Sequence, residues 1–512
     1  MSVATAPVNV DYDVVVIGGG VAGAASAQNL AAQGFRTLLV EANDFASGTS
    51  SRSSRLLYCG LAYFSPEYPI WKFVLRPYDL FARFRMARLA MKNRTHIAVN
   101  TPERVTRHQF FFPIHKDGEF PPWKVGLGYR LLSLFGSKKA PLGYHHLDVE
   151  TGVQRHGLLR HMEQGNLRGF AAFQEYQYNW AERICLDTVM DAERCGAKVL
   201  NYTPVTAITR QGEDWRLTLS PANGPYDVTT RMIVNTAGPW ADRLLRLAIP
   251  APRQHLVGIK GVNVVVKLPD DCRGQGIETI SSRKEPFYLM PWGDYHFFGP
   301  TETVFDGPPE QARVLPEEVE FILAEANRVF PGFALTRKDV VYTWCGVRPR
   351  TSLGRKTGIK SFMIHDMAPE GMPNAITVTS VPIMIHRSAG RDIAAAVSRR
   401  VRPTGTAARL SYAARLLPAN GAQIGGVSVA SLRAAAQTEH VRSLQDLMFR
   451  RVNMGWQADM GLPAARQVAE AVADILGWDS ARIEAEVAAY RAFVIDNFLP
   501  AAADPSRMAV AS

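Results

Sequence analysis

The sequence predicts an α/β protein, and three observations support this. A β-branched run at residues 13–17 is followed by an Ala-rich, helix-prone segment at 21–33 and by a second apolar run at 37–40. Short apolar runs that alternate with helices are typical of buried parallel strands. Strand-like runs that follow one another directly between residues 262 and 298 indicate an antiparallel sheet. After about residue 406, the segments 432–449, 464–476 and 480–493 have the pattern of helices. We therefore expect a parallel sheet flanked by helices, a second domain on an antiparallel sheet, and a C-terminal helical domain.

The composition is that of an ordinary globular protein. Of the 512 residues, 47% are hydrophobic and 21% are charged, which excludes a wholly disordered chain and leaves enough apolar side chains for a large core. The five cysteines are scattered and contain no C-x-x-C pair, which disfavours both a disulfide framework and a metal site. We expect a reducing, cytoplasmic location. No stretch has the pattern of a signal peptide or of a membrane-spanning helix.

The positive charge is concentrated in one segment. The net charge is +11, and residues 65–140 contain fourteen Lys or Arg against five Asp or Glu, together with many aromatic residues. Cationic segments that contain Trp and Phe are typical of lipid interfaces, so we expect peripheral attachment to an anionic membrane surface on the inner face of the cell membrane. The alternative is a substrate domain with a basic face. Nucleic acid is disfavoured as a partner because the sequence contains no recognised nucleic-acid module.

The first glycine-rich turn predicts a dinucleotide site. Gly18-Gly19-Gly20-Val21-Ala22-Gly23 fits the pattern G-x-G-x-x-G between a strand and a helix. Gly18 permits the tight turn, Gly20 lets backbone amides approach a pyrophosphate, and Gly23 lets the helix pack close to the strand. The positive end of the helix dipole faces the phosphates. Glu41 follows the second strand and is expected to accept hydrogen bonds from a ribose. Its charge would repel a 2′-phosphate, which disfavours NADP.

Two further segments favour FAD over NAD. A run of hydroxyl-bearing residues follows Glu41 from Ser47 to Ser54, and a strand near residue 234 ends in N-T-A-G-P-W. The hydroxyl run is expected to surround the pyrophosphate and ribityl chain from the second side; the alternative for this run is a solvated loop. The expected cofactor-binding residues are Gly18, Gly20, Gly23, Glu41, Thr49, Ser50, Ser51, Ser54, Ala237, Gly238 and Trp240.

The chain resembles the FAD-dependent glycerol-3-phosphate dehydrogenases within the D-amino-acid-oxidase-like flavoproteins. Residues 49–56 are similar to the family's T-S-S-x-S-S-K-L, residues 345–349 to S-G-V-R-P, and residues 446–451 to D-L-x-x-R-R. The resemblance implies a Rossmann-like FAD-binding domain, an antiparallel-sheet substrate domain and a C-terminal helical cap. It also implies hydride transfer from a small polar, anionic alcohol to FAD, with electrons passed to quinone or another acceptor.

This resemblance divides the chain into six expected segments. They are an FAD-binding domain in three parts (10–65, 151–245 and 336–397), a basic aromatic segment facing substrate or membrane (66–150), a substrate domain (246–335) and a C-terminal helical domain (406–498).

The substrate side departs from the family pattern. Where the family has H-G-G-L-R-Y, this chain has Ala62 in place of the Arg. Where the family has K-G-S-H, this chain has Asn263 in place of the His, which is the family's candidate base. The family's G-G-K-L-T-T-Y-R corresponds to residues 380–387, which lack the lysine and both glycines. Arg348 remains, and an Arg fork suits a carboxylate or a phosphate. Lys260, Arg350 and Arg387 are candidates to help it.

The expected catalytic residues are Arg348, Lys260, Thr301 and Tyr58. Hydride transfer also requires a group that removes the companion proton. The candidate bases are His255, His296, His386, Tyr58 and Glu302, of which Tyr58 would need a lowered pKa. An amine substrate can lose its proton before it binds and needs no protein base.

Two functional classes therefore stay open. The first is an FAD-dependent oxidoreductase, either a dehydrogenase with glycerol 3-phosphate as the leading substrate or an enzyme for another hydroxy or amine compound. The second is a flavin-binding protein without turnover, which the replacements at Ala62, Asn263 and Pro382 motivate. The sequence leaves the electron acceptor, the oligomeric state and the covalent or non-covalent attachment of FAD open.

Overall fold

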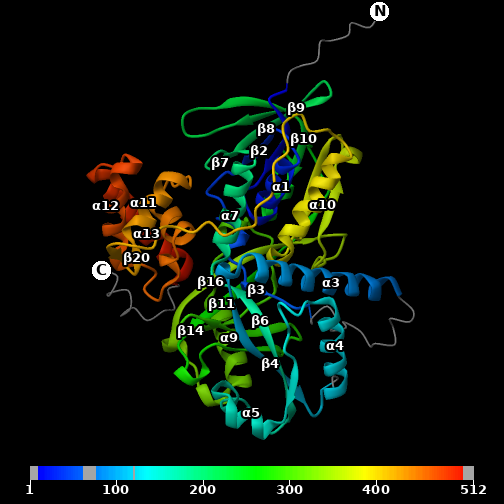
Figure 1. Ribbon diagram of the computed structural model, residues 1–512, viewed down its shortest axis with the longest axis vertical. Helices are drawn as coiled ribbons and strands as arrows, with labels where there is room; N and C mark the ends of the chain where they lie inside the picture. The colour runs from blue at the N-terminus through cyan, green and yellow to red at the C-terminus, as the bar shows by residue number, and fades with distance from the viewer. Residues whose placement is uncertain (1–9, 61–76, 119–120, 500–512) are drawn as a thin grey trace, which may run out of the picture.

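The computed structural model describes residues 10–60, 77–118 and 121–499. Figure 1 shows three parts: a nucleotide-binding sheet with its helices at the top, a second sheet at the bottom, and a group of C-terminal helices at the side. The α/β fold class expected from the sequence is confirmed.

The eight-stranded nucleotide-binding sheet has the strand order β17-β18-β10-β1-β2-β7, with β9 beside β10 and β8 beside β9. The five strands from β18 to β7 run parallel, and every residue of β2 is buried. The strands are β1 Tyr12–Ile17, β2 Thr37–Val40, β7 Lys198–Leu200, β8 Val205–Gln211, β9 Asp214–Leu219, β10 Tyr226–Asn235, β17 Met363–Asp366 and β18 Ala375–Thr379.

Helix α1 (Val21–Ala32) packs between α7 (Ala181–Arg194) and α10 (His386–Ser398). Its small side chains allow a close approach, since a Cβ atom on Gly390 of α10 would lie 2.5 Å from the Ala25 carbonyl oxygen. This contact holds the first βαβ unit against a helix that follows more than 350 residues later.

The second sheet has ten strands in the order β15-β11-β14-β13-β12-β4-β6-β3, with β16 beside β11 and β5 beside β6. All of its pairs are antiparallel except β12 with β4. The strands are β3 Leu56–Leu57, β4 Val105–His115, β5 His145–Leu147, β6 Leu167–Tyr178, β11 Leu256–Val266, β12 Gln275–Ile280, β13 Pro286–Trp292, β14 Tyr295–Gly299, β15 Thr303–Val304 and β16 Val340–Thr351.

The two faces of the second sheet have different neighbours. The outer face packs against α5 (Val149–Arg155), α6 (Gly157–Arg160) and α9 (Pro316–Val329) through one apolar cluster. The other face contributes Trp292 and Trp344 to a cluster shared with the C-terminal helices. We call this second face the site face, because it also carries Arg348.

The expected segment boundaries need correction in three places. Strands β6 and β16, which the sequence analysis assigned to the nucleotide-binding domain, both lie in the second sheet. The basic aromatic segment contributes α3 (Pro77–Asn100), α4 (Pro122–Phe135) and, unexpectedly, strand β4. The reason is packing, because Phe110 and Phe111 of β4 face opposite sides of the sheet and both are fully buried.

The C-terminal part also differs from expectation at one helix. The prediction of a continuous helix over 432–449 was wrong. Helix α11 (Val429–Thr438) ends before His440, which adopts φ 54°, and a separate π-helical turn spans Asp446–Arg451. The Asp446 carboxylate accepts hydrogen bonds from the Arg442 and Ser443 amides, which starts the new turn. Helices α12 (Ala465–Leu476) and α13 (Ser480–Phe498) complete this part, with the small hairpin β19 (Gln423–Ile424) and β20 (Val427–Ser428). Residues 406–422 form an irregular strap.

Candidate active site

The glycine turn lies between β1 and the segment after β10 and is in close contact with both. Gly18 has φ 107°, and a Cβ atom there would lie 2.6 Å from the Thr236 carbonyl oxygen. A Cβ atom on Gly23 would lie 1.8 Å from the Gly18 carbonyl oxygen. The Thr236 amide donates to the Ile17 carbonyl at 2.8 Å. Side chains are therefore excluded from this turn, as expected for a backbone that approaches a pyrophosphate.

Glu41 lies at the carboxyl end of β2, beside this turn. Its Oε2 accepts a hydrogen bond of 2.6 Å from the Gly19 amide, and its Oε1 accepts one of 2.9 Å from the Asn43 amide. Burial raises the pKa of Glu41, and the two amide hydrogen bonds oppose that effect. The side chain is thus fixed as an acceptor next to the turn, where a ribose is expected.

The hydroxyl loop, residues 47–54, lies over the glycine turn. The Val21 amide at the start of α1 donates to Ser50 Oγ at 2.9 Å, and a Cβ atom on Gly20 would lie 3.2 Å from the same oxygen. Thr49 Oγ1 donates to the Val347 carbonyl of β16 at 2.6 Å. The loop therefore joins the nucleotide-binding sheet to the second sheet.

The remaining expected cofactor residues lie around the same turn. Ser51 Oγ donates to the Gly48 carbonyl at 3.0 Å, and Ser54 is half-buried at the end of the loop. The Ala237 amide donates to Asn235 Oδ1 at 3.1 Å, and Gly238 adopts φ 58°. The Trp240 ring lies over Gly48. Three distant segments thus meet at one turn, which we call the cradle, with an acidic acceptor at its end, and this arrangement fits FAD.

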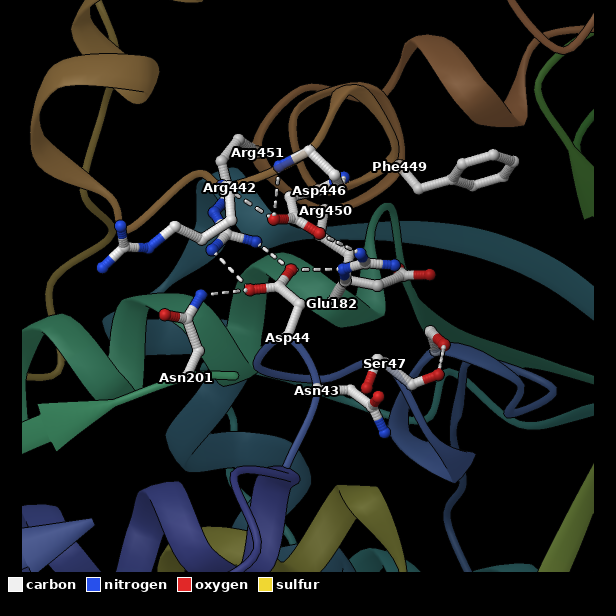
Figure 2. A network of polar contacts seen from close by, with 12 residues as sticks. Asn43, Asp44, Ser47, Glu182, Asn201, Arg442, Asp446, Phe449, Arg450 and Arg451 are labelled. Carbon is white, nitrogen blue, oxygen red and sulfur yellow. Dashed lines mark hydrogen bonds and ion pairs between the residues drawn. The ribbon is translucent and has the colours of Figure 1, made fainter. Parts of the chain in front are cut away.

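A buried ion-pair network holds the C-terminal part against this cradle (Figure 2). Asp44 accepts hydrogen bonds from Arg450 Nε at 2.5 Å, from Arg451 Nη2 at 2.7 Å and from Asn201 Nδ2 at 3.0 Å. Burial on its own would raise the pKa of Asp44, but Arg451 and Arg450 outweigh it and lower the pKa to about 2. Arg450 also donates to Asp446 at 2.7 Å.

Asp44 is three residues from Glu41, and the chain between them is held as well. The Tyr202 amide donates to the Asn43 carbonyl, and the Thr203 amide donates to the Glu41 carbonyl, both at 2.8 Å. The network therefore connects the C-terminal arginines to the loop that positions Glu41. The two arginines belong to the D-L-x-x-R-R motif, but nothing in that motif indicates that they pair with Asp44.

A cation cluster lies on the site face beside the hydroxyl loop. Glu302 Oε1 is 3.1 Å from Arg348 Nη1 and 2.9 Å from Lys360 Nζ, and its Oε2 is 2.5 Å from Arg350 Nη2. Burial alone would raise the pKa of Glu302, but the three cations lower it to about 2. Three positive charges surround one carboxylate, so the cluster keeps a net charge of about +2. The side chain of Arg348 is 36% exposed and is free to contact an anion.

The register of β11 and β16 decides which side chains share a face with Arg348. Arg348 pairs with Ile259, and a Cβ atom on Gly261 would lie 2.7 Å from Arg348 Nη2. Because side chains alternate along a strand, Asn263 lies on the site face and Lys260 lies on the outer face. Lys260 Nζ is 2.9 Å from Glu318 Oε1 of α9. The structure thus separates Lys260 from Arg348, which corrects the expectation that the two act together.

Thr301 and Tyr58 take other roles than expected. Thr301 Oγ1 accepts a hydrogen bond of 3.0 Å from the Val262 amide, and the Thr301 carbonyl accepts one of 2.9 Å from Arg348 Nη2. Thr301 therefore positions Arg348 through its backbone. Burial, and then the charge of Glu278, raise the pKa of Tyr58 well above its ordinary value. A base would require the opposite shift, so Tyr58 is a poor candidate for that role.

The three histidines considered as bases are held in structural contacts. His255 Nε2 lies 2.9 Å from Glu370 Oε1. His296 Nε2 lies 3.1 Å from the Cys272 carbonyl, on the outer face, and His386 Nδ1 lies 2.7 Å from the Ile383 carbonyl. Burial lowers the pKa of His296 to about 4 and that of His386 to about 3. The fifth candidate base, Glu302, is paired with three cations that lower its pKa to about 2, so it binds a proton poorly.

Of the three candidate helpers of Arg348, the structure places only Arg350 beside it. Arg387 instead donates to Thr101 Oγ1 at 3.1 Å. Lys360 was missed because it lies in a loop without a recognisable motif. Two further residues missed by the sequence analysis, Glu278 of β12 and Tyr288 of β13, form a directly opposed pair on the site face. The sequence contains no clear signal for Glu278, because β12 also contains the polar residues Gln275 and Thr279.

The comparisons with known proteins define the class of this site. A family model described as DAO, FAD dependent oxidoreductase, matches residues 13–395, and the chain belongs to this family. It is therefore an FAD-dependent oxidoreductase with FAD as its cofactor, as expected from the three segments of the cradle.

The chain is similar in particular to glycerol-3-phosphate dehydrogenases. It is 25% identical to one from Synechocystis sp. over 96% of this chain and 98% of that protein. It is 26% identical to an aerobic glycerol-3-phosphate dehydrogenase of Bacillus subtilis over 66% of this chain and 58% of that protein. Among solved structures, glycerol-3-phosphate dehydrogenase from Bacillus halodurans complexed with FAD matches with a TM-score of 0.69 and 20% identity, over 95% of both chains. L-α-glycerophosphate oxidase from Mycoplasma pneumoniae with FAD bound matches with a TM-score of 0.58 and 15% identity, over 77% of this chain and 97% of that one. These two structures show the shared fold.

Proposed function

We propose that this protein oxidises the hydroxyl group of a small anionic alcohol, with glycerol 3-phosphate as the leading substrate. The observation that carries the proposal is the cation cluster, which leaves positive charge uncompensated on the site face. Guanidinium groups bind phosphate or carboxylate through paired hydrogen bonds. The two relatives at 25–26% identity, both named as glycerol-3-phosphate dehydrogenases, support the same substrate.

The residues divide the work between two sides of the site. Glu41, the glycine turn and the hydroxyl loop bind FAD, whose bound flavin supplies the acceptor for a hydride. Arg348 binds the substrate anion, Thr301 and Glu302 fix the direction of Arg348, and Arg350 with Lys360 adds positive charge. Thr49 connects the two sides, since it bonds the residue that precedes Arg348.

Anaerobic mixing of purified protein with glycerol 3-phosphate tests the proposal. We expect the visible flavin absorbance band to bleach with glycerol 3-phosphate and to stay unchanged with glycerol, which has the same carbon skeleton but no anion. Reoxidation by an added water-soluble quinone tests the acceptor. Failure of every anionic alcohol in a panel would refute the proposal.

The second candidate is an enzyme for an amine or for another hydroxy compound. It is favoured by Asn263, which replaces the family's candidate base and cannot accept a proton at neutral pH. The same panel with small secondary amines separates the two, because bleaching by an amine and not by the anionic alcohols would select this alternative. A protein that binds FAD and is reduced by no substrate would belong to the class without turnover.

We infer that α4 attaches the enzyme to an anionic membrane surface. Trp123, Leu127 and Leu134 form an exposed stripe on this helix, with 67%, 51% and 79% of their surface accessible. The basic residues Lys124, Arg130, Lys138 and Lys139 lie in or directly after the same helix. In Figure 1, α4 stands at the edge of the molecule next to α3. An apolar stripe beside exposed cations suits the boundary between headgroups and acyl chains. No helix in the described part of the chain is long and apolar enough to cross a bilayer.

Co-sedimentation with vesicles tests this attachment. We expect the protein to sediment with vesicles that contain an anionic phospholipid and to stay in the supernatant with purely zwitterionic vesicles. The double variant Trp123→Ser, Leu134→Ser should lose binding. Leu416→Ser is the matched control, because Leu416 is also 67% exposed but lies in the strap. Equal binding of the stripe variant and the control would refute the inference.

A further inference from the structure

The companion proton of the oxidation needs an acceptor, and the site face offers one away from the family's usual position. Glu278 of β12 stands directly opposite Tyr288 of β13 in an antiparallel pair, so both side chains lie on the site face with Arg348 and Asn263. Glu278 is 4% exposed. Its Oε1 atom has no hydrogen-bond partner among the described residues. A buried carboxyl oxygen without a partner costs free energy, which calls for a functional reason.

The titratable and charged groups near Glu278 come from β6, α3, α4, β13 and the segment that follows β3. Glu175 of β6 is a second buried carboxyl, and it accepts hydrogen bonds from Arg94 Nε of α3 at 3.2 Å and from the Cys59 amide at 2.7 Å. The phenols of Tyr58, Tyr129 of α4 and Tyr288 complete the surroundings. Burial first, and then the negative charge of Glu175, raise the pKa of Glu278 well above its ordinary value.

Tyr288 connects this buried carboxyl to the cation cluster. Its side chain is half-buried, and burial first, then the charges of Glu278 and Glu302, raise its pKa well above the ordinary value, which Arg348 opposes. Tyr288 is therefore a neutral phenol, and a neutral phenol can donate its proton to a carboxylate while it accepts another from a substrate hydroxyl. Such a pair gives the proton a path from the anion-binding residues into the protein.

We propose that Glu278 is the terminal acceptor of the substrate hydroxyl proton and that Tyr288 passes this proton to it. The inference rests on the proposed alcohol oxidation. As the C–H electron pair leaves with its hydrogen as hydride for the bound flavin, the O–H bond breaks and a carbonyl forms. The released proton passes to the Tyr288 phenol oxygen while the original phenol proton passes to Glu278. Tyr288 contacts the substrate, and Glu278 acts through Tyr288.

The neighbouring ion pair makes this acceptor effective. Arg94 compensates Glu175, and Glu278 has no cation of its own among the described residues. A carboxylate placed beside an anion holds a proton more firmly than one in water, and it therefore takes a proton from a hydroxyl more readily. Glu278 must be ionised to accept the proton, so flavin reduction should be slow at low pH and rise as the pH passes the pKa of Glu278.

Single-turnover flavin reduction tests the role of Glu278. In Glu278→Gln we expect the reduction rate at a pH above the pKa of Glu278 to fall by about 10²- to 10⁴-fold and its rise with pH to disappear, while the bound FAD content stays unchanged. In Tyr288→Phe the rate should also fall, because the path to Glu278 is interrupted. Glu320→Gln, on the exposed side of α9, is the control and should behave like the unaltered protein.

Infrared titration of the resting protein gives a readout that needs no substrate. We expect a protonated-carboxyl band that titrates above the ordinary pKa of Glu and is absent in Glu278→Gln. An unaltered rate and pH profile in both Glu278→Gln and Tyr288→Phe would overturn the inference while the oxidation of alcohols stands. Absence of bleaching in the unaltered protein would instead refute the proposed function. If Glu278→Gln does not fold, Tyr288→Phe decides alone.

Discussion

The glycine turn and the site face both lie beside the hydroxyl loop, and they differ in how local their determinants are. The turn consists of consecutive residues, and backbone atoms occupy the positions that Cβ atoms would take on Gly18 and Gly23. The site face takes Arg348, Lys360, Tyr288 and Glu278 from separate elements of one sheet and its loops. A binding motif for a constant dinucleotide can therefore persist while the residues that meet the substrate change one by one.

The largest expected effect concerns the turn. Gly23→Ala would place a Cβ atom 1.8 Å from the Gly18 carbonyl oxygen, so the turn must open. We expect loss of bound FAD and a fall in the free energy of unfolding of more than about 3 kcal/mol, the upper end of the usual cost of overpacking. Absorbance of the purified protein and urea unfolding measure the two quantities. Gly118→Ala is the control, because its nearest contact would be 3.4 Å. A stable Gly23→Ala protein that keeps its yellow flavin colour would contradict the view that local backbone geometry determines the FAD site.

Asp44→Asn probes the connection between the turn and the C-terminal part. It leaves Arg450 and Arg451 buried with less opposing charge, and removal of one partner of a buried pair costs about 3–5 kcal/mol. We expect lower stability and faster FAD release, measured by thermal unfolding and flavin fluorescence. Asp474→Asn, which alters an exposed ion pair with Arg433 inside the C-terminal part, is the control.

The pH dependence of this connection has a definite sign. The pKa of Asp44 is lowered to about 2 in the folded protein, so its contribution to stability is present above the unfolded value near 3.8 and is lost as the pH falls toward 2. Acid-induced FAD release should therefore begin at a higher pH in Asp44→Asn than in the unaltered protein. The same onset in both would show that Asp44 does not couple the C-terminal part to the cofactor.

Arg348→Ala sharpens the comparison on the substrate side. The loss of a charged contact to an anion costs about 3 kcal/mol, so kcat/KM for glycerol 3-phosphate should fall by about 10²-fold. FAD content should stay constant, because Arg348 does not contact the glycine turn. Arg348→Lys keeps the positive charge but lacks the forked guanidinium group, so its kcat/KM should lie between those of the unaltered protein and Arg348→Ala. Steady-state kinetics measure this, and an equal loss of FAD would contradict the division between the two regions.

The smallest expected effect on activity is that of Lys260→Met. Lys260 lies on the outer face with Glu318, so kcat/KM should change by no more than about twofold. Stability should fall, since Glu318 loses its partner. A large loss of kcat/KM at unchanged FAD content would return Lys260 to the substrate site.

Local pattern explains why the nucleotide-binding half could be predicted. The glycine turn and the N-T-A-G-P-W segment are each a contiguous run of residues, and Glu41 directly follows a strand, so local sequence indicates the backbone geometry of each. The site face could not be predicted to the same extent. Whether Lys260 or Asn263 faces Arg348 depends on the register of β11 against β16, and a shift of one residue would exchange the two faces.

The sequence by itself determined the fold class, the dinucleotide motif, the choice of FAD and the survival of Arg348, because each depends on neighbouring residues or on an ordered series of motifs. Only the tertiary structure decided that Lys260 points away, that Lys360 joins Glu302, that Asp44 receives the C-terminal arginines, and that Glu278 faces Tyr288. The physical reason is that strand pairing and burial set these contacts. Apart from Glu278 and Tyr288, which are 10 positions apart, these contacts join residues 58 to 407 positions apart in the chain, which no local pattern encodes.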